Sequence, residues 1–172
     1  MSCSPRFRTG EAKDLGFVRE TLASLRMNPL FIKTERFLVA EDDDGRIFAF
    51  GQVGSSACHS LPIVLMVLCV CFPYECYSHE LASLWVEKSF RHRGVGKALA
   101  KSLMRQLEET RGLARLYLLC LERTTGFYEK VGFERVPAKE VPWLLRAEFT
   151  AGSALFPAAS LACMRGAASV TK

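Results

Sequence analysis

The sequence contains no apolar segment long enough to cross a bilayer. Its longest apolar run, residues 61–73, falls short of the about 20 residues that a membrane-spanning helix needs, and Pro62 and Pro73 bracket it. Residues 1–10 are polar and carry two arginines without an apolar centre, so we predict neither a secretory signal nor a transit peptide. From these absences we expect an intracellular, cytoplasmic protein with no transmembrane segment.

The sequence also lacks internal repeats and low-complexity linkers. Its 172 residues suit one hydrophobic core, since single cores usually serve domains of about 50 to 200 residues. With 49% hydrophobic and 24% charged residues, the composition is that of an ordered globular protein. We therefore predict a single domain over residues 1–172, with an atypical apolar insertion at about residues 55–77.

The cysteine content and the net charge further limit the ligands and the reactive groups that we expect. The seven cysteines form an odd set without a secretory signal, so we expect reduced thiols. Cys69, Cys71, Cys76 and His79 match the usual spacing of a zinc site poorly, and we predict no metal. The net charge of +5 suits an anionic ligand such as a pyrophosphate but is too small and scattered to indicate nucleic acid.

Apolar periodicity predicts alternating strands and helices. The predicted strands cover residues 6–8, 36–41, 46–53, 81–86, 116–121 and 133–136, and an apolar stretch returns at 161–164. A first helix follows a cap at Thr9 and ends at Asn28-Pro29, and a shorter helix covers residues 126–131. A long helix with Val95, Leu99, Leu103 and Leu107 on one face ends at Gly112. This order predicts an α/β fold, in which helices flank a mixed sheet.

The most informative segment is the turn between the strand at 81–86 and the long helix. A turn at a helix N-terminus exposes backbone N–H groups where phosphate binds well. Gly94 and Gly96 allow a close approach of the backbone, while Arg91, Arg93 and Lys97 add positive charge. We therefore predict a pyrophosphate site at this turn.

Three phosphate-binding patterns place glycines near a helix N-terminus, as this turn does. A Walker A loop requires glycine at position 91 and Ser or Thr at position 98, and a dinucleotide fingerprint requires a small residue at position 99. The chain has Arg91, Ala98 and Leu99 instead. The pattern Arg/Gln-x-x-Gly-x-Gly/Ala is met by Arg91, Gly94 and Gly96. With it, the chain resembles the GNAT superfamily of acyl-CoA N-acyltransferases.

A second motif supports the resemblance. Residues 127–133 (FYEKVGF) resemble the F-Y-x-x-x-G-F signature that many GNAT enzymes carry downstream of the turn. The likeness extends over roughly residues 6–165 and is closest to plant and cyanobacterial GNAT domains. It implies a GNAT-type fold, a central mixed and mostly antiparallel sheet flanked by helices.

The resemblance also implies roles for particular residues. The backbone of Leu84, Trp85 and Val86 would bind the pantetheine arm of acetyl-CoA. The residues of the pyrophosphate turn would be Arg91, His92, Arg93, Gly94, Val95, Gly96 and Lys97. Glu80 would be the general base, and Tyr128 the general acid toward the coenzyme A sulfur, since a phenol with a pKa of about 10 suits a thiolate of about 8.5.

Simpler roles for these side chains stay open. Glu80 would otherwise be a solvated residue at the start of a strand, and Tyr128 a packing aromatic like Phe127 and Phe133. We expect His79 to be exposed at the strand entry. Cys120 lies in an apolar strand and is expected in the core, because a reactive thiol needs an electropositive, accessible setting.

The apolar insertion departs from the family pattern. Three explanations are open: an added buried strand, a partner or membrane contact, or a segment that does not belong to the functional protein. A loosely held apolar run of this kind would favour aggregation.

We thus expect an N-acetyltransferase that passes an acetyl group from acetyl-CoA to a primary amine by direct attack in a ternary complex. The alternatives are a catalytically silent acyl-CoA-binding or interaction module and a basic nucleic-acid adaptor. The sequence does not indicate whether the acceptor is a small molecule or a protein, although residues 142–149 are expected to shape its site. The oligomeric state stays open between a monomer and a homodimer.

Overall fold

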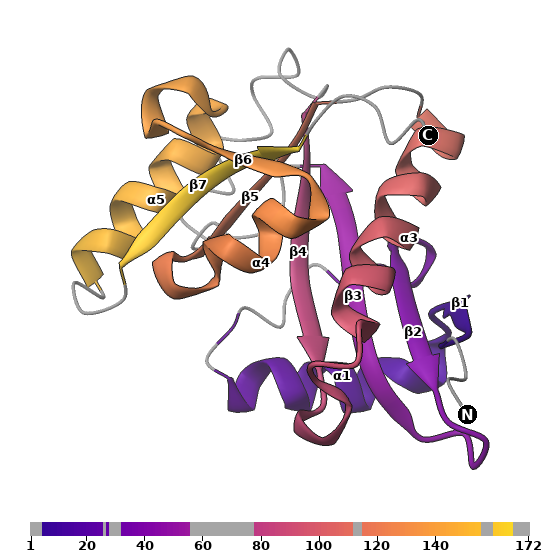
Figure 1. Ribbon diagram of the computed structural model, residues 1–172. Coiled ribbons are helices and arrows are strands. Elements are labelled where there is room, and N and C mark those ends of the chain that lie inside the picture. The colour runs from indigo at the N-terminus through magenta and orange to yellow at the C-terminus, as the bar shows by residue number, and fades with distance from the viewer. Residues whose placement is uncertain are drawn as a thin grey trace. The chain divides into compact units, whose positions relative to one another are not determined.

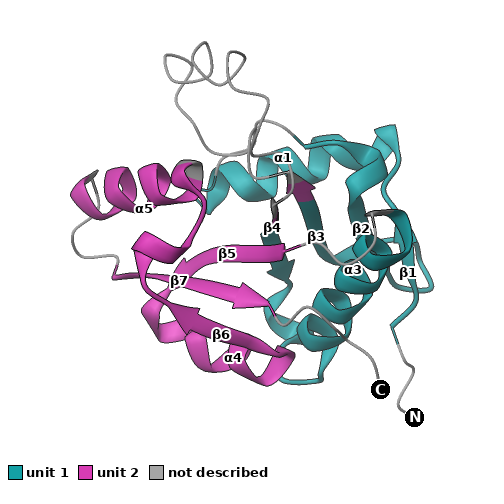
Figure 2. Ribbon diagram, turned by 90° about the horizontal axis from the view of Figure 1, so that it is seen from above, with its two compact units in different colours: residues 1–53, 81–110 teal, residues 54–80, 111–172 magenta. Residues whose placement is uncertain are grey.

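A computed structural model describes residues 5–25, 27, 32–55, 78–111, 115–155 and 160–166. The chain divides into two compact units (Figure 2). Unit 1 comprises Met1–Val53 and Leu81–Thr110, and unit 2 comprises Gly54–Glu80 and Arg111–Lys172. The seven strands follow the order β1-β2-β3-β4-β5-β7-β6 in one mixed sheet (Figure 1), which confirms the predicted α/β class.

Unit 1 contains the N-terminal strands and the long helix. Its elements are β1 (Phe7–Thr9), α1 (Leu15–Ser24), β2 (Phe37–Glu41) and the larger parts of β3 (Ile47–Ser55), β4 (Ser78–Val86) and α3 (Val95–Arg111), with 3₁₀ turns at Ala12–Asp14, Thr34–Arg36 and Lys88–Phe90. β1 and β2 pair antiparallel, and so do β2 and β3. Figure 1 shows these elements in indigo to rose.

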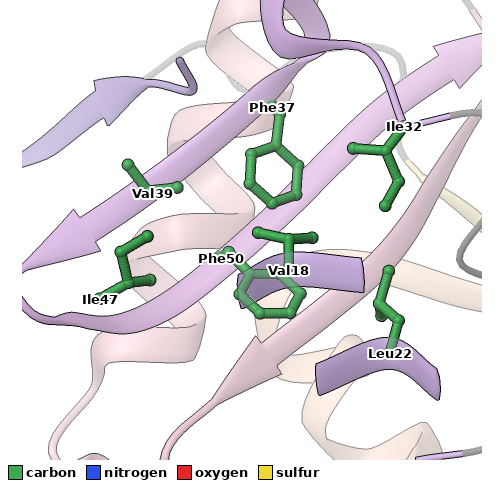
Figure 3. Packing of buried hydrophobic residues seen from close by; sticks show 7 residues of the cluster. All are labelled: Val18, Leu22, Ile32, Phe37, Val39, Ile47 and Phe50. Atoms are coloured by element: carbon green, nitrogen blue, oxygen red, sulfur yellow. The ribbon is translucent and has the colours of Figure 1, made fainter. Parts of the chain in front are cut away.

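The sheet of unit 1 is covered on both faces. On one face, Val18 and Leu22 of α1 pack against Phe37 and Phe50 (Figure 3). The rest of this buried cluster is Ile32, Val39 and Ile47. On the other face, Leu103 of α3 lies over Gly51 of β3. Alternate residues of β2 and β3 thus serve the two layers, as the period of a strand requires.

The first helix begins differently from the prediction. Thr9 ends β1, and a capping box joins Glu11 to Asp14 before α1 starts at Leu15. The predicted cap at Thr9 is therefore wrong, because the chain first makes a 3₁₀ turn. Leu25 is 46% exposed, so the apolar face ends at Leu22. Asn28 and Pro29 lie outside the described residues.

The tight turn of the β2–β3 hairpin agrees with its Asp-Gly signal. The Asp42 carboxylate accepts hydrogen bonds from the backbone N–H groups of Asp44 (3.2 Å) and Arg46 (2.8 Å). Gly45 has a φ of 77°, a conformation that glycine adopts without strain. The strands predicted at 36–41 and 46–53 thus form an antiparallel hairpin.

Unit 2 contains the C-terminal elements. They are β5 (Arg115–Leu121), α4 (Thr125–Val131), β6 (Phe133–Val136), α5 (Trp143–Leu155) and β7 (Leu161–Gly166), with 3₁₀ turns at Glu122–Thr124 and Ala138–Glu140. β7 pairs antiparallel with both β5 and β6. Residues Ser78–Glu80 of β4 pair parallel with Arg115–Tyr117 of β5. The mixed, mostly antiparallel sheet that the resemblance implied is thus confirmed.

Each face of the unit 2 sheet is buried by its own helix. Tyr117 and Cys163 pack with Leu145 of α5, together with Val136 and Val141. On the opposite side, Cys120 contacts Met164 (3.7 Å between the sulfur atoms), and both are buried. α4 lies on that second side, next to β6. We refer to these as the α5 face and the α4 face of unit 2.

Candidate functional site

The predicted pyrophosphate turn lies in unit 1, between β4 and α3. β4 ends at Val86, a 3₁₀ turn covers Lys88–Phe90, and α3 begins at Val95. The Arg91 Nε–H group donates to the Val86 carbonyl (2.9 Å), which ties the turn to the end of the strand. The Ala98 N–H group donates to the Gly94 carbonyl (3.0 Å) and closes the first turn of the helix.

The backbone of this turn is shaped for close approach of a ligand. Gly94 has a φ of 82°, His92 has a φ of 61°, and residues 91–94 are exposed. A Cβ atom at Gly94 would meet no atom within 4 Å, so the space beside it is open. The N–H groups of residues 95–97 belong to the first helical turn, where they have no intrahelical acceptor. An anion is favoured at this position.

Aromatic packing holds the turn in place. Phe90 stacks on Phe48 of β3, with ring centroids 4.2 Å apart, and the Arg93 guanidinium lies 5.7 Å from the centre of the Phe90 ring. The Glu87 N–H group donates to the Phe48 carbonyl (2.8 Å), and the Glu87 carboxylate pairs with Arg46 (2.8 Å). The turn is therefore anchored to β3 through both backbone and side chains.

The strand before the turn carries the predicted pantetheine contacts. Ser83 has a φ of 56°, which interrupts the regular geometry of β4 just before Leu84, Trp85 and Val86. The Trp85 ring stacks on Phe50 (4.9 Å between centroids), so its side chain belongs to the core of unit 1. Its backbone role toward a cofactor stays a prediction.

Glu80 is the most unusual side chain of unit 2. It is 5% exposed, and its Oε2 atom is buried without a hydrogen-bond partner. Burial raises its pKa well above the ordinary value of 4.5, and the nearby Glu148 carboxylate raises it further. The solvated alternative for Glu80 is therefore wrong. His79, expected to be exposed, is also buried at 7% exposure.

The register of β4 with β5 places Glu80 on a particular face. Glu80 is aligned with Tyr117, and aligned residues on neighbouring strands point to the same side of a sheet. Tyr117 packs with Leu145 of α5, and Phe149 joins the same cluster. Glu148 lies between these two contacts along α5. The two carboxylates therefore meet on the α5 face.

Tyr128 lies on the other side of unit 2. Its ring packs edge-on against Phe127 (4.9 Å) and Phe133 (6.0 Å) from the half-buried surface of α4. Burial, and to a smaller extent the Cys120 thiol, raises the pKa of its phenol. The group thus stays protonated and able to donate. Sequence reasoning had placed Glu80 and Tyr128 in one site; within unit 2 they belong to opposite faces of the sheet.

The remaining predictions on reactive groups have mixed outcomes. Cys120 is buried at 8% exposure, and burial raises the pKa of its thiol, which confirms its predicted place in the core. Cys69, Cys71 and Cys76 lie outside the described residues. In the part of the chain that is described, no cluster of three metal-ligating side chains occurs, and no helix is long and apolar enough to cross a membrane.

A known protein family matches the part of the sequence that contains this turn and the strands before it. The family described as acetyltransferase (GNAT) domain matches residues 33–135, more than half of the chain. The chain therefore belongs to the GNAT acetyltransferase family, as the two motifs predicted. No curated protein matches the sequence significantly.

Solved structures with the same fold share little sequence with the chain. N-acetylglutamate synthase from Neisseria gonorrhoeae, complexed with coenzyme A and N-acetyl-glutamate, is 15% identical with a TM-score of 0.67 over 95% of this chain and 35% of that one. Rv2747 from Mycobacterium tuberculosis, in complex with CoA and NLQ, is 20% identical with a TM-score of 0.66 over 94% and 98%. Glucosamine-6-phosphate N-acetyltransferase from Arabidopsis thaliana is 20% identical with a TM-score of 0.54 over 78% and 95%.

These likenesses show the fold. The chain spans about a third of the N-acetylglutamate synthase chains that it resembles. Family membership supports an acyltransferase.

Proposed function

We propose that the protein transfers an acetyl group from acetyl-CoA to a primary amine by direct attack in a ternary complex. The observation that carries this proposal is the turn at Arg91–Gly96. Its positive φ angles, its open space at Gly94 and its place at the N-terminus of α3 suit a pyrophosphate. Coenzyme A in two of the similar structures supports acetyl-CoA as the co-substrate.

The cofactor would be held along unit 1. Backbone N–H groups of Val95, Gly96 and Lys97 would bind the pyrophosphate, with Arg91, His92 and Arg93 around it. The backbone of Leu84, Trp85 and Val86 would pair with the amides of the pantetheine arm. The interruption of β4 at Ser83 supports this role, because it alters the direction of the strand just before these residues.

The proton transfers would fall to unit 2. The amine nitrogen attacks the thioester carbonyl carbon, and the C–S bond breaks when the tetrahedral intermediate collapses. Glu80 in its ionised form would take the proton that the ammonium group must lose. The protonated Tyr128 phenol would give a proton to the departing thiolate.

A silent acyl-CoA-binding module is the second candidate. The raised pKa of Glu80 favours it, since a carboxyl group that holds its proton accepts none. Both candidates bind coenzyme A, and only the enzyme releases free thiol when acetyl-CoA and an amine are supplied. Thiol release that depends on the amine would therefore exclude the silent module.

The cofactor site is tested by Gly94→Asp. A carboxylate against the pyrophosphate should weaken coenzyme A binding by more than about tenfold, because two like charges would be brought together in the space that is open beside Gly94. Calorimetric titration of the purified chain measures this affinity.

Gly45→Asp is the matched control. Gly45 also has a positive φ of 77°, with no atom within 4 Å of an added Cβ, but it lies in the β2–β3 turn. The control should therefore suffer the same backbone strain and keep its affinity. Equal affinity in the Gly94→Asp variant would refute the site.

A further inference from the structure

Gln52 of β3 places an amide in the interior of unit 1. It is 2% exposed, and its alignment with Phe37 of β2 puts its side chain on the sheet face that α1 covers, in the same layer as Phe50. Among the described residues, no donor reaches its Oε1 atom. A buried polar atom without a partner is costly, and an apolar side chain of the same shape would avoid this cost. The amide therefore needs an explanation other than packing.

The hydrogen bond that the amide does make leads to Ser83 of β4. Gln52 Nε2 donates to Ser83 Oγ (3.4 Å), and Ser83 has a φ of 56°. A residue with a Cβ atom is strained in this left-handed region and persists there only where its surroundings hold it. The contact from a buried, well-packed neighbour supplies such a hold.

Ser83 lies at the point where β4 turns from one set of contacts to another. Before it, Ser78–Glu80 pair with β5. After it, β4 lies close against β3: a Cβ atom at Gly51 would be 2.9 Å from Leu84 Cδ1 and 3.6 Å from Leu84 Cα. A change of backbone conformation at Ser83 would therefore turn residues 84–86, whose N–H and C=O groups we assign to the pantetheine arm.

We propose that Gln52 is a positioning residue of the acetyl-CoA site: it holds Ser83 in the left-handed conformation that directs residues 84–86 toward the pantetheine arm. Gln52 acts through Ser83 and not by contact with the cofactor. The inference rests on the proposed function and concerns the pantetheine part of the cofactor site. The pyrophosphate turn has a separate anchor on β3, through the stacking of Phe90 on Phe48.

Two ligands separate these two parts of the site. Coenzyme A would contact both, whereas 3′-phospho-ADP is coenzyme A without its pantetheine arm. The ratio of their affinities for the full chain, measured by calorimetric titration, gives the contribution of the arm. Gln52→Met keeps the length of the side chain and removes the amide. It should lower this ratio by about fivefold or more, as expected for a lost hydrogen bond, and leave the affinity for 3′-phospho-ADP unchanged.

Gln106→Met is the matched control. Gln106 of α3 also donates from its Nε2 atom over 3.4 Å, to the Glu35 carbonyl, in an exposed contact of unit 1. This variant should keep both affinities. An unchanged ratio in Gln52→Met would overturn the proposal. An equal loss for both ligands would overturn it as well, because that is the result of a purely structural role.

Ser83→Ala tests the same link from β4 and does not depend on the folding of Gln52→Met. It removes the acceptor at a partly exposed position and should lower the ratio by a similar factor. In the double variant the loss should be no larger than in either single variant, since both substitutions remove one hydrogen bond. Losses that add up would show that Gln52 acts independently of Ser83 and would overturn the proposal.

A failure of this inference differs in its result from a failure of the proposed function. If the wild-type chain binds coenzyme A no more tightly than 3′-phospho-ADP, the pantetheine strand on which both rest is refuted. If the wild-type chain shows a large ratio that Gln52→Met and Ser83→Ala keep, the role of Gln52 is refuted and the proposed function stands.

Discussion

At the scale of single residues, Glu80 lowers the stability of the fold that it belongs to. Its pKa in the folded protein is raised above the ordinary 4.5 by burial and by Glu148. Between pH 4.5 and the raised pKa, the folded state holds a proton that the unfolded state has lost. The free energy of unfolding therefore falls as the pH rises through this range.

Glu80→Gln should consequently stabilise the protein at neutral pH. The amide keeps the shape of the side chain and removes the cost of protonating, on folding, a carboxyl group that is ionised in the unfolded chain. The gain should shrink as the pH falls and vanish below pH 4.5, where the acid is protonated in both states. Urea denaturation at several pH values measures the difference. A gain that is independent of pH would show that the effect is one of packing.

Tyr128→Phe separates a catalytic phenol from a packing aromatic. The ring contacts with Phe127 and Phe133 survive in the variant, so its fold and its affinity for coenzyme A should not change. If the phenol protonates the thiolate, kcat should fall by about 100-fold or more, in the range of general acid catalysis. Steady-state kinetics with acetyl-CoA and an amine measures kcat. An unchanged kcat would show that the Tyr128 ring only packs and that its phenol has no catalytic role.

Sequence reasoning reached some of these residues and missed others for a physical reason. Gly94 and Tyr128 belong to short motifs, in which the chemistry fixes the spacing along the chain. Glu148 belongs to none: it meets Glu80 only because β4 and α5 pack in unit 2, 68 positions apart in sequence. The one available signal was that Glu148 is the only acidic residue of α5.

At the scale of elements, the C-terminus of α4 depends on a glycine. Gly132 has a φ of 115°, and its N–H group donates to the carbonyls of Tyr128 (3.1 Å) and Glu129 (3.0 Å). Gly132→Ala should destabilise the fold by about 1–2 kcal/mol, since a Cβ atom is strained at positive φ. Thermal unfolding measures the loss.

A glycine in the same helix provides the control. Gly126 lies inside α4, and an added Cβ there would meet no atom within 4 Å. Gly126→Ala should therefore stabilise the protein by about 0.5–1 kcal/mol, because alanine favours the helix. If both substitutions changed stability in the same direction, the cap would not be the cause.

The helices and strands that the sequence predicted best are those in which one sequence pattern dominates. β6 coincides with its predicted bounds, and β2, β3, β5 and α3 differ from theirs by few residues at the ends. α5 was missed, because Pro142 and Gly152 and a continuous apolar stretch at its start conceal the helical period. The apolar stretch at 161–164 is part of the strand β7, whose pairing with β5 and β6 is not encoded in any local sequence pattern.

At the scale of the whole molecule, the fold class and family followed from the order of the elements and from two motifs. The single domain with its insertion at about residues 55–77 stays a prediction, since residues 56–77 lie outside the described part of the chain. Every residue that we place in the cofactor or acceptor site lies outside this segment. The contribution of residues 56–77 to function therefore has to be measured by comparing the intact chain with a chain that lacks them.

We predict that the chain without residues 56–77, rejoined by a short glycine-serine linker, still folds and binds acetyl-CoA. A ligand at about 100 times its dissociation constant stabilises the folded state by about 2.7 kcal/mol. Both the full chain and the deletion variant should therefore unfold at a higher temperature with acetyl-CoA than without it. Gly94→Asp in each background is the control and should abolish the shift.

The comparison of the two chains also determines what the segment does. Equal shifts would show that the insertion is tolerated and has no part in cofactor binding. A shift in the deletion variant alone would mean that the insertion impairs a working fold, as expected of a segment foreign to the functional protein. A shift in the full chain alone would contradict the prediction and assign the segment a structural role. No shift in either folded chain would refute the acetyl-CoA site at Arg91–Gly96, and the proposed transferase with it.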